Sequence, residues 1–241
     1  MKQLILIRHG QSLWNAENRF TGWVDSPLSE RGVQEAIKAG RLIKEFNIDV
    51  EEAFTSFLSR AIDTLNFLLK ELGKNNLIIN KTWYLNERHY GSLTGLNKEE
   101  TKQKIGESLF LKYRRSWNIA PPPMEKNNKN ISLFGSLNKT IPADKVPNTE
   151  SLKDTHDRVI QYYNETISNI FKKNNVVIIV AHGNSLRALC KYLFKISDEE
   201  INTLEIPTGN PMIVNLTDNL IVDNALYLDS NRAKPIISFD K

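Results

Sequence analysis

The N-terminal stretch is Leu4-Ile5-Leu6-Ile7-Arg8-His9-Gly10, an apolar run that stops abruptly at an arginine, a histidine and a glycine. A run this short predicts a strand buried on both faces, and ligands bind beyond the ends of such strands in open α/β sheets. Arg8 offers forked donors suited to phosphate or carboxylate, and His9 can act as base, metal ligand or nucleophile. Gly10 lets the backbone turn and approach a ligand. These residues alone favour a ligand site and an ordinary strand end equally.

Length and composition are those of an ordinary globular protein. The chain has 241 residues, 40% of them hydrophobic and 25% charged, and can bury its core as one large α/β domain, 1–241. The lone cysteine, Cys190, excludes an internal disulfide and lies in an apolar run, where we expect it to pack. No apolar segment approaches membrane-spanning length, so we expect a cytoplasmic protein without a membrane partner.

Strand and helix patterns alternate along most of the chain. Strands are predicted at 4–7, 51–56, from 77, at 176–181, 212–216 and near 221–228. Helices are predicted after the N-cap Ser29, around Arg60, at 150–173 and from Leu186. This alternation predicts the α/β class, with a mostly parallel central sheet flanked by helices on both faces.

The alternation is interrupted between about 83 and 149. Residues 85–91 are polar and aromatic, residues 97–115 are helical in composition, and the Pro- and Asn-rich residues 121–130 cannot form a packed element. We therefore predict a helical and loop insertion that covers the carboxyl edge of the sheet, where an active site is expected.

A second buried strand ends in the same way as the first. Val180-Ala181-His182-Gly183 repeats the pattern of Ile7-Arg8-His9-Gly10. Because side chains just past parallel strands project into one crevice, neighbouring strands would bring His9 and His182 together. Two of only four histidines occupy these equivalent places, which favours a functional role for both.

Arginines indicate the ligand. Neither the His and Cys spacings of zinc sites nor a serine-hydrolase elbow occurs, so we expect no metal. Forked donors match phosphate oxygens two at a time, and a neutral imidazole can attack phosphorus to form a phosphohistidine. For Arg187 we favour a solvated surface charge or a structural pair. The arginines at motif-like or helix-start positions are Arg8, Arg60, Arg88, Arg114, Arg115 and Arg187.

Several motifs together carry a family resemblance. They lie at residues 6–12, Asn15, 19–23, Ser56, 60–61, 85–98, 114–115, 150–151, 182–185 and 206–209. They resemble the histidine phosphatase superfamily and, within it, the 2,3-bisphosphoglycerate-dependent phosphoglycerate mutases. The similarity runs from residue 2 to about residue 228. Arg-His-Gly alone indicates only the superfamily, whereas residues 86–98, the paired arginines and residues 206–209 are specific to the mutase branch.

The resemblance implies an activity and a set of roles. It implies interconversion of 3-phosphoglycerate and 2-phosphoglycerate, in glycolysis and gluconeogenesis, primed by 2,3-bisphosphoglycerate. His9 would be the phosphorylated nucleophile, with its far ring nitrogen held by a backbone carbonyl, and Glu87 the general acid and base. The groups implied to surround the phosphoryl group are Arg8, Arg60, His182 and the Gly183 amide. The residues implied to bind substrate are Ser12, Asn15, Thr21, Gly22, Arg88, Tyr90, Lys98, Arg114, Arg115, Gly183 and Asn184.

The end of the chain departs from the family pattern. Mutases of this branch usually carry a flexible tail of small residues and lysines, whereas this chain has Asp229-Ser230-Asn231-Arg232 and an apolar 235–239. Closure by a tail, and therefore the ratio of mutase to phosphatase activity, stays open. A phosphatase or a bisphosphoglycerate mutase on the same scaffold is the nearest alternative. Family members are often dimers or tetramers, so the resemblance implies a homodimer.

A binding protein without catalysis is the alternative from another class. The net charge of +4 and the pI near 9.0 suit an anionic partner, although abundant lysine and asparagine give the same balance without one. A nucleic-acid binder needs a contiguous Lys and Arg stripe with stacking aromatics. Here the lysines are scattered and the arginines sit in the motifs, so we expect no nucleic-acid partner.

Overall fold

The computed structural model describes residues 2–125 and 141–236, and within them a six-stranded sheet lies at the centre. The strands are β1 (Lys2–Arg8), β2 (Glu52–Thr55), β3 (Ile79–Lys81), β4 (Val176–Ala181), β5 (Met212–Leu216) and β6 (Val222–Tyr227). In the order β3-β2-β4-β1-β5-β6, the first four strands are parallel and the last two antiparallel to their neighbours. The predicted, mostly parallel α/β sheet is confirmed.

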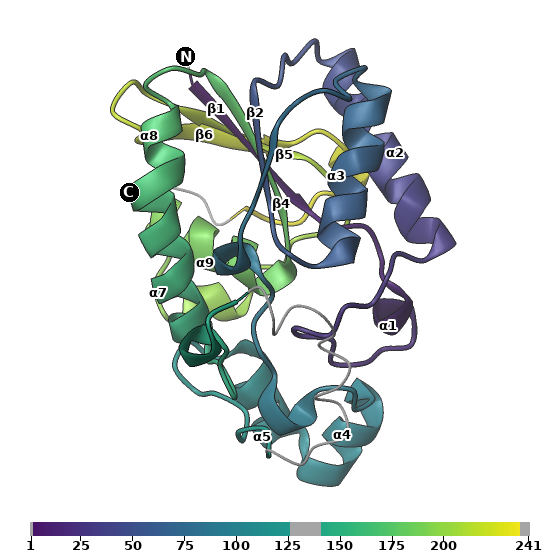
Figure 1. Ribbon diagram of the computed structural model, residues 1–241. Helices are drawn as coiled ribbons and strands as arrows, with labels where there is room; N and C mark the ends of the chain where they lie inside the picture. The colour runs from purple at the N-terminus through teal and green to yellow at the C-terminus, as the bar shows by residue number, and fades with distance from the viewer. Residues whose placement is uncertain (1, 126–140, 237–241) are drawn as a thin grey trace.

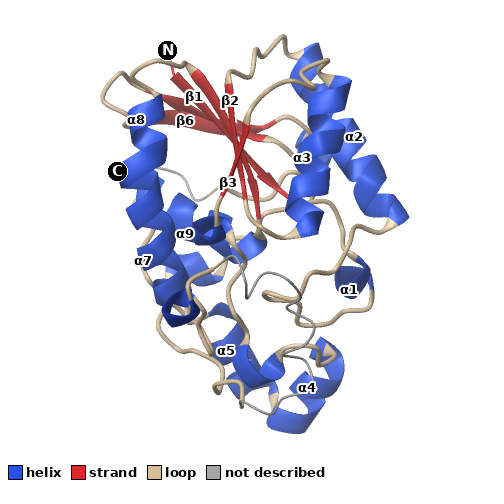
Figure 2. Cartoon of the chain, in the orientation of Figure 1, coloured by secondary structure: helices blue, strands red, loops and turns tan. Residues whose placement is uncertain are grey.

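Helices cover both faces of this sheet (Figures 1 and 2). The α-helices of the described residues are α1 (Leu13–Ala16), α2 (Glu30–Glu45), α3 (Ser59–Glu71), α4 (Lys98–Ile105), α5 (Glu107–Arg115), α7 (Leu152–Tyr162), α8 (Ser168–Ile170) and α9 (Gly183–Leu193), of which α1, α4 and α5 lie beyond the edge of the sheet. Helices α2 and α3 pack on one face, and α7 and α9 on the other. None of the helices in the described part of the chain has the length and apolar character needed to cross a bilayer.

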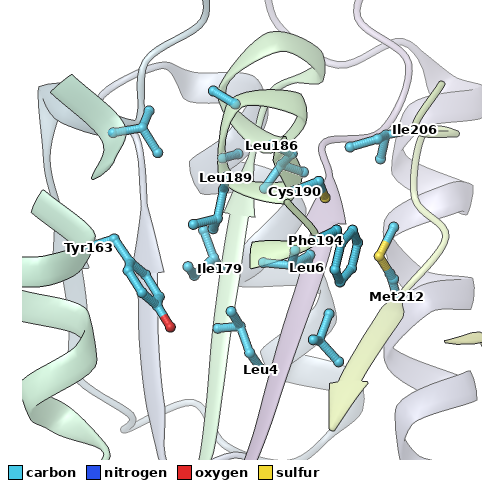
Figure 3. Packing of buried hydrophobic residues seen from close by; sticks show 14 of the residues in the cluster. Leu4, Leu6, Tyr163, Ile179, Leu186, Leu189, Cys190, Phe194, Ile206 and Met212 are labelled. Atoms are coloured by element: carbon cyan, nitrogen blue, oxygen red, sulfur yellow. The ribbon is translucent and has the colours of Figure 1, made fainter. Parts of the chain in front are cut away.

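Strand β1 is buried on both sides, as its unbroken apolar run predicts. Leu4 and Leu6 point into the core under α7 and α9 (Figure 3). Ile5 and Ile7 point into the core under α2 and α3. All four side chains are 0% exposed, and each contributes about 1.5–3 kcal/mol through burial. Cys190 of α9 is also fully buried there, which confirms its packing role.

Local structure follows the sequence closely, with three differences. The helix predicted over 150–173 is interrupted, because a π-helical turn at Tyr163–Ile167 separates α7 from α8. Ser29 caps α2 as predicted, since its hydroxyl accepts a hydrogen bond from the Gly32 amide. Strand β3 begins at Ile79 rather than at Leu77, and Ile78 is 75% exposed. The helix predicted over 97–115 is two helices, because Gly106 has a φ of 83° that a helix cannot contain. The predicted irregular run at 126–130 and residues 237–239 lie outside the described residues.

The loop after β1 lies against the start of α2 with no room for a side chain between them. A Cβ added to Gly10 would lie 2.2 Å from the Gly32 carbonyl oxygen, and one added to Gly32 would lie 2.1 Å from that of Gln11. The close partner that the structure shows for Gly10 is thus a backbone segment, and its approach to a ligand stays a prediction. Gly10 lets two backbone segments pack together, which fixes where β1 delivers Arg8 and His9.

Candidate active site

The two strand ends meet as predicted. Strands β1 and β4 are parallel neighbours, with Arg8 in register with Ala181, so the residues that follow them lie side by side. The rings of His9 and His182 have centroids 4.9 Å apart and are tilted by 60°. Both side chains are buried, being 2% and 0% exposed. Adjacent strands thus place the histidine pair in a protected position beyond the sheet.

The ring of His9 is held in one tautomer. Nδ1 lies 2.6 Å from the Gly10 carbonyl oxygen, which can only accept, so Nδ1 carries the proton. Nε2 then accepts a hydrogen bond from Nε of Arg60 at 3.3 Å. Burial, and then the charges of Arg60 and Arg8, hold the pKa of His9 well below its ordinary value. His9 is therefore a neutral imidazole with a lone pair on Nε2 at neutral pH.

His182 packs behind His9. Its Nε2 lies 2.8 Å from the Ser56 hydroxyl, and its Nδ1 has no hydrogen-bond partner among the described residues. Burial, and then the charges of Arg60 and of protonated His9, hold the pKa of His182 well below its ordinary value. The two neutral rings therefore coexist without charge repulsion.

Arg60 is a buried cation fixed by main-chain carbonyls. It projects from the first turn of α3 and is 1% exposed. Its Nη1 donates to the Val24 carbonyl and its Nη2 to the Gly22 carbonyl, each at 2.8 Å. Burial lowers the pKa of Arg60 to about 10, which still leaves the guanidinium charged at neutral pH. Its fork is therefore set in place before any ligand arrives.

Glu87 is positioned by backbone donors on both sides of the site. It is 8% exposed, and its Oε1 accepts hydrogen bonds from the amides of Arg88 at 2.8 Å and Asn184 at 3.1 Å. Its own carbonyl accepts from Trp23 at 2.6 Å and from Arg158, which pairs with buried Glu150. Its Oε2 faces the start of α9, where it lies 3.7 Å from the position of a Cβ on Gly183.

A pocket of about 210 Å³ opens between these groups and the region at 83–149. Most residues predicted for the site line it. They are Arg8, His9, Asn15, Thr21, Gly22, Arg60, Glu87, Tyr90, Lys98, Arg114, Arg115, Gly183 and Asn184. Helices α4 and α5 bring Lys98, Arg114 and Arg115 to its wall. The described part of that region thus contributes cations opposite the strand ends.

Three predicted residues do not line this pocket. Ser12 is fully buried and caps α1, where its hydroxyl accepts from the Asn15 amide. Arg88 turns away and donates to the carbonyls of Tyr113 and Arg114, both at 3.0 Å, so that it holds the end of α5 in place. His182 contacts the pocket only through the ring of His9.

Cations crowd the wall formed by α4 and α5. Burial, and then the charge of Arg114, lower the pKa of Lys98 to about 8. Burial and the charge of Arg115 also lower the pKa of Arg114. Because like charges so close together repel one another, this wall favours an anion that brings negative charge between them.

Comparison with known proteins places the chain in a family. Residues 4–132 and 132–222 match the histidine phosphatase superfamily, branch 1. This chain belongs to the histidine phosphatase superfamily. Relatives named 2,3-bisphosphoglycerate-dependent phosphoglycerate mutase include one from Pelagibacter ubique (strain HTCC1062), 50% identical over 99% of this chain and 100% of the relative. Another, from Borreliella afzelii (strain PKo), is 48% identical over 97% of this chain and 95% of the relative.

Solved structures share the superfamily fold. A mycobacterial glucosyl-3-phosphoglycerate phosphatase matches with a TM-score of 0.69 and 22% identity, over 89% of this chain and 93% of that one. At this identity the likeness concerns the fold only. The resemblance seen in the motifs is therefore confirmed at two levels, as a superfamily fold and as full-length similarity to proteins of the mutase branch.

Other lining residues of this superfamily member were missed by sequence reasoning. They are Arg19, Arg187, Glu205, Ile206, Pro207 and Lys234. Arg187 is 4% exposed, so the surface-charge alternative was wrong and the structural pair was right. It donates to the Asn184 side-chain oxygen at 2.8 Å and to the Ile201 carbonyl at 2.6 Å. Burial lowers the pKa of Arg187 to about 9. The sequence around Arg187 carries no signal of this burial.

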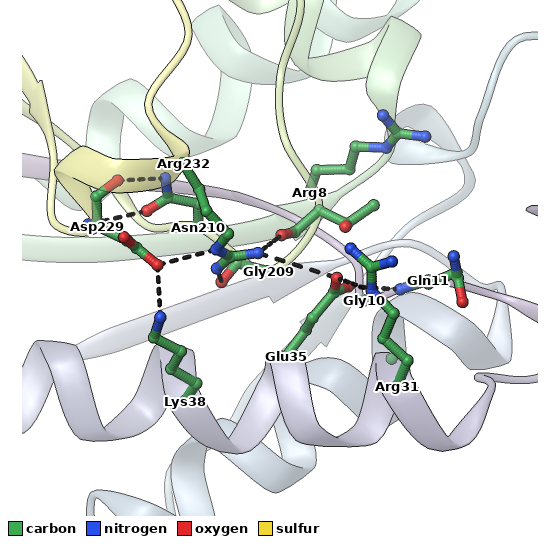
Figure 4. Close-up of polar contacts among 12 residues, drawn as sticks. Arg8, Gly10, Gln11, Arg31, Glu35, Lys38, Gly209, Asn210, Asp229 and Arg232 are labelled. Atoms are coloured by element: carbon green, nitrogen blue, oxygen red, sulfur yellow. Dashed lines mark hydrogen bonds and ion pairs between the residues drawn. The ribbon is translucent and has the colours of Figure 1, made fainter.

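The atypical C-terminal segment braces the strand end from behind (Figure 4). The Gly209 amide donates to the Arg8 carbonyl at 2.8 Å. Arg232 donates to the carbonyls of Thr208 and Gly209, at 3.1 and 3.2 Å, and to the Asp229 carboxylate at 2.8 Å. Lys38 of α2 also pairs with Asp229 at 2.6 Å. The segment after β6 is thereby tied to the backbone that carries Arg8.

Proposed function

We propose that this chain is a 2,3-bisphosphoglycerate-dependent phosphoglycerate mutase, an isomerase that interconverts 3-phosphoglycerate and 2-phosphoglycerate through phosphorylated His9. The observation that carries the proposal is the fixed tautomer of His9. A buried neutral imidazole whose Nε2 lone pair faces Arg60 is suited to attack phosphorus, and a buried histidine with a purely structural role needs no such arrangement. Full-length similarity to proteins of that name supports the same activity.

Phosphoryl transfer to His9 is the first step. Nε2 attacks a phosphorus of the bisphosphate, the N–P bond forms, and the bond from phosphorus to the ester oxygen breaks. Arg8 and Arg60 stabilise the charge on the equatorial oxygens. We assign the Ser56 hydroxyl as donor to Nε2 of His182. That assignment leaves the proton on Nδ1 of His182, whose buried ring packs against His9 and supports the nucleophile.

Glu87 moves the proton in both directions. Its protonated form gives a proton to the leaving oxygen when His9 is phosphorylated. In the second step a hydroxyl of monophosphoglycerate attacks the phosphorus, the N–P bond breaks, and the carboxylate of Glu87 takes the hydroxyl proton. Backbone amides hold Oε1, so Oε2 is the oxygen that exchanges the proton.

Retention of the bisphosphate intermediate distinguishes a mutase from a phosphatase. The intermediate must turn round and return its other phosphoryl group before water attacks the phosphohistidine. Lys98, Arg114 and Arg115 line the wall opposite His9, where they can hold the carboxylate and the second phosphate during this turn. The side-chain amide of Asn184 donates a hydrogen bond to the Tyr90 hydroxyl at 3.0 Å, and both side chains supply uncharged contacts to the ligand.

The activity assay tests this function directly. Pure protein is incubated with 3-phosphoglycerate, a trace of 2,3-bisphosphoglycerate and a chelator, because the proposed reaction needs no metal. We expect 2-phosphoglycerate as the main product, and free phosphate as the main product would contradict a mutase. His9→Ala should fall to background, whereas the control His156→Ala should match wild type, because His156 contacts Asp157 and Trp117 outside the pocket. Full activity in His9→Ala would end the proposal.

The resemblance also carries three finer proposals. We propose 2,3-bisphosphoglycerate as the phosphoryl primer, a cytoplasmic location and a homodimer. Omitting the primer from the assay should leave a lag that added bisphosphate removes. Light scattering on the pure protein and fractionation of cells check the dimer and the location.

A further inference from the structure

Glu205 is an unexpected group in an anion-binding pocket. Among the described residues that line the pocket, eight are lysines or arginines and two are glutamates. One glutamate, Glu87, is buried and has a proton to move. Glu205 has no such task, and its side chain is 50% exposed. Its charge opposes that of any phosphate or carboxylate that enters.

The carboxylate of Glu205 occupies cations that a substrate would use. Its Oε1 accepts from Nη2 of Arg115 at 2.6 Å, and its Oε2 lies 4.0 Å from Nζ of Lys234. Burial works in the opposite direction, but the charge and hydrogen bond of Arg115 hold the pKa of Glu205 below its ordinary value. Glu205 is therefore an ionised internal counter-anion within the pocket wall.

The position of Glu205 is fixed by the backbone that follows it. The Ile206 carbonyl accepts a hydrogen bond from Nη1 of Arg8 at 3.0 Å, and the Gly209 amide donates to the Arg8 carbonyl. Arg232 holds the Thr208 and Gly209 carbonyls, and Lys234 follows it by two residues (Figure 4). Glu205 thus cannot leave the pocket edge without disturbing the strand end, although its side chain can change rotamer.

We propose that Glu205 is a specificity-determining residue that competes with the ligand for Arg115 and so weakens binding of doubly phosphorylated ligands more than of singly phosphorylated ones. A partly exposed ion pair costs little to open, so a ligand can displace Glu205 from Arg115. The displaced carboxylate remains nearby and repels the ligand in proportion to its charge. This inference rests on the proposed function for the identity of its ligands, a bisphosphate primer and monophosphate substrates.

The physical consequence is control over release. A pocket with eight cations would hold a bisphosphate far more tightly than a monophosphate, because affinity for polyanions rises with the number of paired charges. The charge of Glu205 reduces this difference in affinity between bisphosphate and monophosphate. Transfer to His9 turns the primer itself into a monophosphate, so Glu205 acts on further free bisphosphate, whose weaker binding leaves the pocket of the phosphorylated enzyme accessible to substrate.

Titration calorimetry on the full chain tests the role of Glu205. Dissociation constants are measured for inorganic phosphate, 3-phosphoglycerate and 2,3-bisphosphoglycerate. Opening one partly exposed ion pair costs up to ~1 kcal/mol. Glu205→Gln should therefore lower the dissociation constant of 2,3-bisphosphoglycerate about fivefold. The constant of 3-phosphoglycerate should fall by less, and that of inorganic phosphate by less than about twofold. Glu205→Asp, which keeps the charge, should stay within about twofold of wild type for all three ligands.

A matched control separates the pocket from net charge. Glu71→Gln removes the same charge from a pair with Arg41 outside the pocket and should leave all three constants at wild-type values. Equal tightening of all ligands by Glu205→Gln, or weaker bisphosphate binding, would overturn the inference while leaving the mutase assay untouched. Conversely, the dissociation constants of 3-phosphoglycerate and 2,3-bisphosphoglycerate could change in the predicted ratios while the protein forms no 2-phosphoglycerate. That outcome would overturn the proposed function alone. Absence of bisphosphate binding to wild type would overturn both.

Discussion

Two groups of residues, one lining and backing the inner end of the pocket and one at its outer wall, are built differently. The inner group is His9, Arg60, Glu87 and His182, all less than 9% exposed. Backbone groups hold the first three of them, and Ser56 holds the last. The outer group is Lys98, Arg114, Arg115 and Glu205, which are all partly exposed. In the outer group, Arg115 pairs with Glu205, and Lys98 and Arg114 each lie over an aromatic ring. The charges of Lys98 and Arg114 also repel each other.

This difference separates reaction from recognition. Groups fixed by main-chain hydrogen bonds need no reorganisation as charge develops on phosphorus, so they suit the chemical step. Side chains held by weak, exposed pairs can change partners, which suits an intermediate that must turn round inside the site. Substitutions in the inner group should therefore reduce kcat, and those in the outer group should change KM.

The largest effect is expected from removal of Glu87, the residue that carries the proton. Glu87→Gln keeps the shape of the side chain and loses general acid and base catalysis, so kcat should fall by roughly 10²- to 10⁴-fold, with KM little changed. Steady-state kinetics check this. The control Glu107→Gln alters an exposed pair with Lys102 and should leave both constants unchanged. A kcat within tenfold of wild type would remove Glu87 from the mechanism.

Loss of one outer cation should act mainly on binding. Arg114→Gln removes a charge from the wall at α5, and KM for 3-phosphoglycerate should rise about tenfold while kcat stays within about threefold. Arg41→Gln, on α2 away from the pocket, provides the matched control. If Arg114→Gln lowered kcat as strongly as Glu87→Gln, the two groups would not differ in the way proposed.

The smallest effect is expected from the titration of Lys98. Its pKa is lowered to about 8 by burial and by the charge of Arg114, so the ammonium is present below that pH and is lost as the pH rises through it. KM for the anionic substrate should therefore increase a few-fold between about pH 7 and pH 9. In Lys98→Arg this rise should flatten, since arginine stays charged. An unchanged pH profile in Lys98→Arg would assign the rise to another group.

Sequence reasoning found the inner group because it rests on local patterns. Two apolar runs each ending in a histidine and a glycine predicted adjacent strands, and the register of β1 with β4 confirms that arrangement. Arg60 near the start of its helix and Ser29 as an N-cap followed in the same way. Such signals are readable because strand period and helix capping are properties of neighbouring residues.

Other positions depended on contacts between distant segments. Ser12 and Arg88 belong to the right motifs, yet one caps a helix and the other holds the backbone at the end of α5. Gly10 serves the contact with Gly32. Arg187 is buried against Asn184, and no spacing in the sequence distinguishes that place from the surface of α9.

The sequence by itself determined the class of fold, the pair of histidines and the phosphate chemistry, because each is written in runs of a few residues whose local physics is strong. Only the tertiary structure showed that the Gly10 carbonyl holds Nδ1 of His9 and that Arg60, from a distant helix, faces Nε2. It also brought Glu205 to Arg115, across about 90 residues of chain, and Lys234 to Glu205. An ion pair between such distant residues leaves no periodic pattern to read.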